Sequence, residues 1–409
     1  MIADELFRQM GIPVPVYSEA TIVTPDGMEW AERYVPGGFH PTHIGDMYHD
    51  GRYEIVHKLG WGSFATVWLA RDNKEGRYVA LKIHAADAFE NSQDGRAYVS
   101  TLLDEFVING PNGQHLCIVS KAAGCSVWDQ KNETLARYSP KTARAISAQL
   151  LLGLDYIHAC GVVHADLHEK NIVFQFPIFQ QVTSNSELYE TVDKPRIEPL
   201  RRMDRCPISD EEARHLPRYF VYPPYKIFAE ADKIVDPKIL IVDFGASFSQ
   251  GQGKLEDLKC CRTHLPIEAF FEKDEPISPA VDVWEAGCTI YDILGKQRLF
   301  LKLVDSMVDI LGVLPKRWWD RWEWRSDSFN EDGSPKGDMH SESLPMQIQY
   351  LRSEYAPATL EYSPEEFASL EKLLRAMLAY ETSERITISE ALQSEWMVRW
   401  ALPAIKEAL

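Results

Sequence analysis

The sequence predicts an α+β fold with two lobes, a small and mainly β N-terminal lobe followed by a larger helical C-terminal lobe. Residues 53–83 alternate like three short strands separated by turns. From Ser139 onward, the pattern is dominated by amphipathic or fully apolar helices. The length of 409 residues suffices for one large two-lobed domain or for two modest ones.

Composition narrows the class of protein. Apolar residues make up 45% of the chain and charged residues 25%, which is ordinary for a soluble globular protein. The formal net charge of −18 disfavours direct binding to nucleic-acid phosphates and would attract a basic partner. The same acidity can equally serve solubility alone.

The cysteines indicate a reducing compartment. The seven cysteines lack regular spacing, so we expect no disulfide framework and a location in the cytoplasm, the nucleus or both. The adjacent Cys260 and Cys261 indicate a metal or redox site only weakly, because no further ligand stands at metal-binding spacing. No apolar run is long enough to predict a membrane span, and the N-terminus lacks a secretory signal.

Residues 1–50 contain prolines, glycines and aromatic residues without a clear period. We interpret them as an N-terminal extension that packs on the following domain, with Trp30, Tyr34 and Tyr48 as anchors. A loose tail is the alternative, and the aromatic residues argue against it.

Residues 51–121 form the predicted N-terminal lobe, and its first hairpin carries Gly60 and Gly62. Two glycines at this spacing let a backbone approach phosphate groups closely. Lys82 follows Gly62 by 20 residues on a strand, where its ammonium could lie over those phosphates. An ordinary solvated strand lysine is the alternative. The predicted nucleotide-binding residues are Leu59, Gly60, Trp61, Gly62, Ser63, Phe64, Ala65, Thr66, Val67 and Lys82.

Residues 122–409 form the predicted C-terminal lobe, whose first long helix begins at Ser139-Pro140 and leads into a polar loop. In that loop, Asp166 follows a histidine by two residues and precedes Asn171 by five. This is the spacing of a phosphotransferase catalytic loop, in which the aspartate orients or deprotonates a hydroxyl and the asparagine holds a metal ion. Asp243 ends an apolar strand beside a Phe-Gly pair and suits Mg²⁺ binding.

Three later residues, Asp282, Glu268 and Arg385, also belong to the predicted C-terminal lobe. Asp282 lies inside an apolar helix and needs hydrogen-bond partners, which the backbone amides of the polar loop would supply. Glu268 and Arg385 are expected to form a buried structural ion pair.

Two stretches interrupt this lobe. Residues 179–236 are rich in proline and read mainly as an insertion, with short helices at 209–215 and 225–231. Residues 315–348 begin with four tryptophans and read as a surface excursion whose aromatic residues pack inward. A carbohydrate- or peptide-binding role of the tryptophans is the alternative.

Together these motifs resemble those of a eukaryotic protein kinase from about residue 51 to residue 400. The segments Tyr34–Pro41, Gly51–Tyr53 and Gly110–Cys117, together with the long insertion, resemble the fungal type of SR-protein-specific kinase. The resemblance implies the two-lobed protein kinase fold, ATP and Mg²⁺ as cofactors, and serine in Arg/Ser-rich proteins as the substrate. It implies Asp166, Lys82 and His168 as catalytic residues and Asn171 and Asp243 as Mg²⁺ ligands. We expect a monomer without nucleic-acid or membrane partners.

Three positions depart from the kinase pattern. The segment after Lys82 leaves room for only one or two helical turns, so the helix whose glutamate pairs with that lysine is shortened or missing, and Glu90 is the available stand-in. His168 stands where kinases usually have lysine near the γ-phosphate. Ser120-Lys121-Ala122 replaces the usual bulky and acidic entry to the hinge.

Two alternatives to an active kinase therefore stay open. A pseudokinase would bind nucleotide or partners without turnover. A small-molecule phosphotransferase would share the loop around Asp166, but Glu268, Asp282 and Arg385 argue against it, because those families lack this set in the larger lobe.

Overall fold

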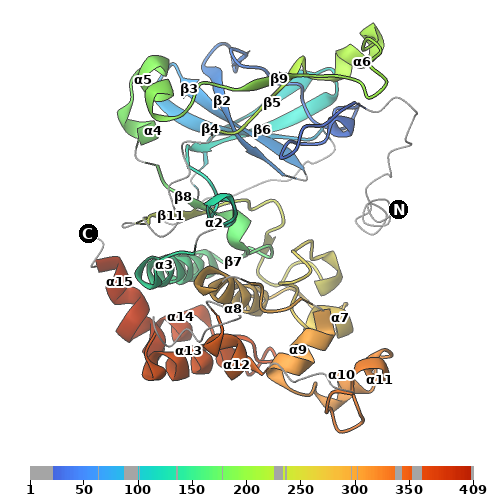
Figure 1. Ribbon diagram of the computed structural model, residues 1–409, viewed down its shortest axis with the longest axis vertical. Helices are drawn as coiled ribbons and strands as arrows, with labels where there is room; N and C mark the ends of the chain where they lie inside the picture. The colour runs from blue at the N-terminus through green and yellow to red at the C-terminus, as the bar shows by residue number, and fades with distance from the viewer. Residues whose placement is uncertain are drawn as a thin grey trace. The chain divides into compact units, whose positions relative to one another are not determined.

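The computed structural model describes residues 22–62, 64–86, 100, 102–134, 137–176, 178–224, 234, 237–295, 297–301, 303–336, 343–351 and 362–406. These residues form two compact units (Figure 1). The sheet unit draws on residues 22–86, 102–122 and 176–224, and the helical unit draws on residue 100 and on residues 123–175 and 234–406.

The sheet unit is built on a six-stranded antiparallel sheet with the strand order β1-β2-β3-β4-β6-β5 (Figure 1). The predicted three strands in 53–83 are confirmed as β2 to β4, and a turn at 110–113 joins β5 to β6. The strands are β1 (Met47–Tyr48), β2 (Tyr53–Trp61), β3 (Ala65–Asp72), β4 (Arg77–His84), β5 (Leu102–Gly110) and β6 (Gly113–Lys121).

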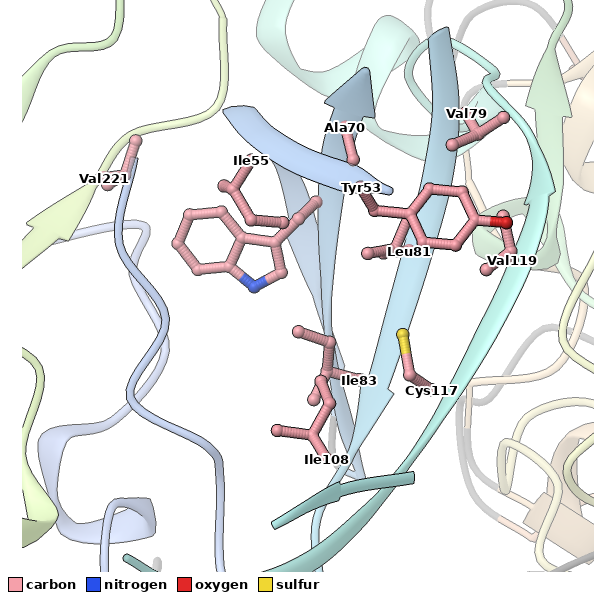
Figure 2. Packing of buried hydrophobic residues seen from close by; sticks show 11 residues of the cluster. Tyr53, Ile55, Ala70, Val79, Leu81, Ile83, Ile108, Cys117, Val119 and Val221 are labelled. Carbon is pink, nitrogen blue, oxygen red and sulfur yellow. The ribbon is translucent and has the colours of Figure 1, made fainter. Parts of the chain in front are cut away.

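A hydrophobic cluster covers one face of this sheet (Figure 2). Its members recur at every second residue along β2, β3 and β4, because successive side chains of a strand point to opposite faces. Burial of each large apolar side chain contributes about 1.5–3 kcal/mol. The buried members are Tyr53, Ile55, Trp68, Ala70, Val79, Leu81, Ile83, Ile108, Cys117, Val119 and Val221.

Most of the predicted insertion belongs to the sheet unit, which corrects its assignment to the C-terminal lobe. Val221 completes the sheet's hydrophobic cluster (Figure 2), and the Tyr189 hydroxyl donates to the Val56 carbonyl oxygen at 2.9 Å. The hydroxyl of Tyr78, in β4, donates a hydrogen bond to the side-chain oxygen of Asn185 at 2.7 Å. The described elements of this stretch are α4 (Ile178–Gln181), α5 (Asn185–Thr191), β9 (Ile197–Pro199), α6 (Asp210–His215) and β10 (Tyr219–Val221), where β9 and β10 pair antiparallel.

The described part of the N-terminal extension, residues 22–50, packs as predicted, around a buried acid. The carboxylate of Glu29 forms an ion pair with Lys58 of β2, and both side chains are fully buried. Tyr34 donates its hydroxyl to Glu29 at 2.7 Å, and burial, followed by the charge of Glu29, raises the pKa of Tyr34 well above its usual value. Tyr34 is thus a confirmed anchor, and Tyr48 packs against the sheet cluster. Trp30, the third predicted anchor, is 42% exposed, so it does not join the buried core of the extension.

The helical unit contains the remaining elements. Ser139 caps its longest helix by accepting a hydrogen bond from the Thr142 amide, with Pro140 in the first turn, as predicted. The helices are α2 (Val127–Thr134), α3 (Pro140–Ala159), α7 (Glu268–Phe271), α8 (Ala280–Leu294), α9 (Leu303–Leu311), α10 (Lys316–Trp319), α11 (Arg325–Ser328), α12 (Leu344–Gln349), α13 (Pro364–Met377), α14 (Ile388–Leu392) and α15 (Leu402–Lys406). Short strands and turns join them: β7 (Val162–Val163), η2 (Glu169–Asn171), β8 (Ile172–Phe174), β11 (Ile239–Ile241), β12 (Phe248–Ser249), η4 (Leu255–Asp257) and η6 (Met397–Ala401).

Helix α3 packs against α8 and α15 (Figure 1). Every residue of α8 from Val281 to Leu294 is buried, which agrees with its apolar sequence. Trp318, Trp319 and Trp322 are buried too, so the packing interpretation holds for them, whereas Trp324 is 70% exposed. Among the described helices, none combines the length and apolarity that crossing a bilayer requires.

Some predictions fall outside the described residues. They concern Ser63, the Glu90 segment after the sheet's fourth strand, and the predicted helix at 225–231.

We predict that Glu29→Gln destabilises the protein by about 3–5 kcal/mol, because it leaves the Lys58 ammonium buried without its anion. Urea unfolding of the whole chain measures this change. Glu198→Gln is the matched control, since Glu198 pairs with a largely exposed Arg201, and its effect should stay below about 1 kcal/mol. Equal losses in the two variants would show that the buried pair contributes no more than a surface pair.

Candidate active site

The predicted nucleotide loop is the hairpin between β2 and β3. Gly60 lies opposite Val67, Trp61 lies opposite Thr66, and the Gly62 amide donates to the Ala65 carbonyl oxygen at 2.9 Å. A Cβ built on Gly60 or Gly62 would meet no atom within 4 Å. The space over both glycines is therefore open, as close approach of a phosphate to the backbone requires.

Lys82 lies beside this hairpin within the same unit. It occupies the middle of β4, directly opposite Val67 of β3 on one side and Ile118 of β6 on the other. Its neighbours Leu81 and Ile83 are buried in the sheet cluster. Because side chains alternate along a strand, Lys82 emerges on the face opposite that cluster. The sheet unit thus brings together the glycine hairpin and the lysine that the sequence predicted to act jointly.

In the helical unit, the catalytic loop is held by Asp282 of α8. One carboxylate oxygen accepts the His164 amide at 2.8 Å, and the other accepts the Ala165 amide at 2.8 Å. His158 approaches the first of these oxygens through Nε2 at 2.9 Å. The predicted partnership between Asp282 and the loop amides is confirmed.

Backbone strain explains why so strong an anchor is needed. Ala165 has a φ of +60°, a left-handed conformation that costs about 1 kcal/mol or more for a residue with a Cβ. Two charge-assisted hydrogen bonds, each contributing about 1.5–3 kcal/mol, offset that strain. They hold the turn that follows β7, in which Asp166 is partly exposed.

Three polar side chains of the loop then meet. The side-chain nitrogen of Asn171 donates a hydrogen bond to the backbone carbonyl oxygen of Asp166 at 2.8 Å and another to the Asp166 carboxylate at 3.2 Å. His168 Nε2 lies 3.4 Å from the other carboxylate oxygen of Asp166. The structure therefore brings Asp166, His168 and Asn171 together, and it fixes the amide of Asn171 so that the side-chain oxygen remains to bind a cation.

Asp243 reaches the same loop along β11. This strand pairs with β8, and the amide of Val242 donates to the Asn171 carbonyl oxygen at 2.9 Å. His164 binds the Val242 carbonyl oxygen at 3.1 Å through Nε2 and packs edge-on against the ring of Phe244. Asp243 itself has a φ of +68°. The backbone of the Asp-Phe-Gly turn is thus tied to Asn171 and His164.

The donor set of this unit suits magnesium. An amide oxygen from Asn171 and a carboxylate from Asp243 are hard oxygen ligands, and Mg²⁺ in proteins commonly takes one or two such ligands together with phosphate oxygens and water. The glycine hairpin and Lys82 supply amides and a cation, which suit the phosphates themselves. The residues of the helical unit therefore fit Mg²⁺, and those of the sheet unit fit phosphate groups.

Sequence reasoning missed several residues that support the loop. Glu285 accepts the Leu167 amide at 2.7 Å, and burial, followed by the charge of Asp282, raises its pKa well above the usual value. Its position three residues after Asp282, on the same helical face, was a usable signal. Lys131 of α2 donates to Glu169 at 2.6 Å and to the Asp292 carbonyl oxygen at 2.8 Å. No local pattern indicates that contact.

The predicted ion pair below the loop is confirmed. Arg385 donates to both carboxylate oxygens of Glu268, at 2.7 and 2.9 Å, and also to the carbonyl oxygens of Ala280 and Ala379. Both side chains are buried, so the bidentate geometry and the extra acceptors offset their desolvation. The pair ties α7 to the start of α8.

Comparison with known proteins gives a family that agrees with this geometry. The protein kinase domain family matches residues 53–179 and 227–397, which is most of the chain. The chain belongs to the protein kinase family. The match leaves out residues 180–226, a stretch inside the predicted insertion.

Several relatives of this kinase-family chain carry informative names. A serine/threonine-protein kinase SRPK of Physarum polycephalum is 27% identical over 405 residues, covering 90% of this chain and 91% of that protein. Protein kinase dsk1 of Schizosaccharomyces pombe is 39% identical over 36% of this chain and 30% of its own length. Serine/threonine-protein kinase SKY1 of Saccharomyces cerevisiae is 34% identical over 41% of this chain and 25% of its own length. The predicted resemblance to SR-protein kinases is confirmed.

A solved structure supports the kinase fold. The crystal structure of a kinase domain superposes with a TM-score of 0.56 at 16% identity, covering 87% of this chain and 98% of the other. The predicted α+β fold with a small sheet lobe and a larger helical lobe is therefore confirmed.

We predict that Asp282→Asn loosens the catalytic loop, because one amide oxygen replaces two charged acceptors for the His164 and Ala165 amides. Hydrogen exchange of the peptide over residues 162–167 should become at least about tenfold faster, since loss of about 1.5 kcal/mol changes an opening equilibrium by that factor. Asp155→Asn on the outer part of α3 is the control and should leave this peptide unchanged. Unchanged exchange in Asp282→Asn would mean that other contacts hold the loop.

Proposed function

We propose that the protein is a serine/threonine protein kinase that transfers the γ-phosphate of ATP to serine in Arg/Ser-rich protein segments. The observation that supports this function best is the contact of Asn171 with both Asp166 and the Val242 amide. Asp282 holds the loop that contains Asp166. The chain also belongs to the protein kinase family.

Each residue of the set has a role in this proposal. Asp166 orients the substrate hydroxyl and accepts its proton as the new bond to phosphorus forms. Asn171 keeps the Asp166 carboxylate in position and, with Asp243, would hold Mg²⁺. Lys82 would position the phosphates under the Gly60–Val67 hairpin. Bound ATP with Mg²⁺ supplies the transferable phosphoryl group, and the protein contributes positioning and charge neutralisation.

His168 replaces the usual lysine in this loop. Its contact with Asp166 through Nε2 places a titratable ring where a fixed positive charge would otherwise stand near the transferred phosphoryl group. We propose that it acts in catalysis by orienting Asp166 and, when protonated, by compensating negative charge.

The substrate class rests on the relatives and on charge. Among the relatives is the human SRSF protein kinase 3, 34% identical over 40% of this chain. The net charge of −18 favours encounter with arginine-rich segments over encounter with acidic ones. The chain spans 91% of the Physarum relative but a third or less of the other three, so the substrate assignment is a proposal for this chain.

The presence of His168 also favours a second candidate, a pseudokinase that binds nucleotide without transferring phosphate. The two candidates share the binding groups Lys82, Asn171 and Asp243, and they differ only in turnover. Separate tests of binding and of transfer distinguish them.

The binding test is a thermal shift with ATP and Mg²⁺. We expect saturating ATP to raise the melting temperature by about 5 °C, and Asp243→Ala to remove the Mg²⁺-dependent part of that rise. Asp204→Ala, in a surface turn of the insertion, is the control and should keep the whole shift. A wild-type protein with no response to ATP and Mg²⁺ would contradict both candidates.

The transfer test uses an arginine–serine repeat peptide and radiolabelled ATP. We expect phosphate on serine, and we expect Asp166→Asn to lower the rate by about 10²- to 10⁴-fold with ATP binding retained. Asp155→Asn should leave the rate unchanged. ATP binding without transfer to this peptide or to other protein substrates would favour the pseudokinase.

A further inference from the structure

Two adjacent thiols near the catalytic loop are not used in the proposed mechanism of phosphoryl transfer. Cys260 and Cys261 lie between η4 and α7, and all seven cysteines of the chain are free thiols. Around Cys261 the structure gathers a set of polar side chains that we call the Cys261 cluster: Cys261, Thr263, His264, Asp292 and Arg298.

The two thiols have opposite surroundings. Cys260 faces Glu285, and burial, followed by the charge of that acid, raises the pKa of the Cys260 thiol well above its usual value. Cys260 therefore stays protonated. Cys261 instead faces hydrogen-bond donors and positive charge.

Arg298 is the first positive group at Cys261. Its Nη1 donates to the Cys261 sulfur at 3.1 Å, and the Thr263 hydroxyl lies 3.2 Å from the same sulfur. The guanidinium is held in place by a hydrogen bond to Thr263 and by the Trp128 ring, whose centroid lies 5.0 Å away. A fixed guanidinium against sulfur stabilises the thiolate over the thiol.

His264 is the second positive group. It is buried, and its Nε2 lies 3.4 Å from the carboxylate of Asp292. Burial by itself lowers the pKa of His264, but the contacts with Asp292 and Cys261 outweigh burial and raise it to about 10. The imidazole is therefore protonated at neutral pH.

The Cys261 thiol responds to these neighbours. Burial raises its pKa, but the hydrogen bonds from His264 and Thr263 outweigh burial and lower it to about 5. The sulfur is then a thiolate at pH 7, and it stays partly exposed to solvent. The order of charges, carboxylate to imidazolium to thiolate, is the arrangement that activates sulfur nucleophiles.

The cluster also contacts the catalytic loop. The ring of His264 packs edge-on against His168, with the centroids 6.2 Å apart, and His168 contacts Asp166. A group attached to the Cys261 sulfur would add volume and change charge beside His264, the ring that contacts His168.

We propose that Cys261 is a modification site, whose thiolate reacts with peroxides and other soft electrophiles. With hydrogen peroxide, the sulfur attacks one oxygen, the sulfur–oxygen bond forms and the oxygen–oxygen bond breaks. The sulfur loses two electrons and the peroxide gains them. The leaving hydroxide takes the proton of the His264 imidazolium, giving a sulfenic acid, water and neutral imidazole.

The proposal has a second part, that modification of this thiol stops phosphoryl transfer. This second part rests on the proposed function. Loss of the thiolate removes the anion that stabilises the His264 imidazolium, and the ring of His264 packs against His168, which contacts Asp166. A thiol reagent can restore activity, because sulfenic acids are reducible.

Thiol reactivity is tested without any kinase assay, on the full chain. The rate of iodoacetamide labelling at Cys261, followed by peptide mass spectrometry, should change less than about twofold between pH 6 and pH 8, because the thiol is ionised throughout. N-acetylcysteine in the same tube should react on the order of 50- to 100-fold faster at pH 8 than at pH 6, as an ordinary thiol does. A Cys261 rate that rises as steeply as that of N-acetylcysteine would overturn the proposal.

Variants identify the groups responsible. Arg298→Gln should steepen the pH dependence at Cys261, whereas Arg399→Gln, which removes a distant surface guanidinium, should leave it flat. The wild-type result stands on its own even where Arg298→Gln does not fold. Equal pH profiles in wild type and in folded Arg298→Gln would exclude the guanidinium as the cause.

Peroxide treatment tests the consequence for phosphoryl transfer, with each variant compared with its own untreated rate. The wild-type protein should lose most of its activity and regain it with dithiothreitol. Cys206→Ser, which removes an exposed thiol in the insertion, is the control and should respond as the wild type does. Cys261→Ser should keep its activity. Equal inhibition of Cys261→Ser would overturn the regulatory part, while a protein without transfer activity contradicts the proposed function and leaves the labelling result intact.

Discussion

The conformation of the catalytic loop depends on the hydrogen bonds that the carboxylate of Asp282 accepts. It accepts backbone amides from two consecutive residues, and one of them, Ala165, has the left-handed backbone that turns Asp166 out of the core. A neutral side chain could not offer two charged acceptors to that turn. Because Glu285 binds the next amide but one, the first turns of α8 act as a template for the loop. Arg385 and Glu268 then fix where that helix begins.

The same loop combines rigid and titratable elements. The backbone amide of Val242 ties the strand before Asp243 to Asn171, which holds the two proposed Mg²⁺ ligands near each other. His168 and the Cys261 cluster bring imidazole and thiolate to the edge of that rigid set. A lysine at position 168 would place a flexible ammonium in the loop, whereas histidine places a ring nitrogen 3.4 Å from the Asp166 carboxylate. The departure from the usual kinase residue and the unusual thiol are therefore parts of one electrostatic neighbourhood.

The sheet unit depends on contacts that come from three distant parts of the chain. The extension places Glu29 against Lys58, the insertion places Val221 in the sheet cluster, and β2 to β6 supply the rest. A small lobe buries a smaller fraction of its surface than a large one, so added segments that extend its core stabilise it. This explains why the proline-rich insertion folds onto the sheet although its sequence follows the catalytic loop.

The sequence alone determined the strands of the sheet, the capped start of α3, the Asp166–Asn171 spacing and the need of Asp282 for partners, because side-chain periodicity, capping and motif spacing are local properties. The tertiary structure alone decided where the insertion packs, that Trp30 is exposed, and which residues support the loop. Lys131 meets Glu169 across 38 residues and Arg298 meets Cys261 across 37, and no local pattern encodes such contacts. The low pKa of Cys261 is due mainly to His264 and Thr263, which are close in sequence, but the positive charge of His264 depends on Asp292, which only folding brings near.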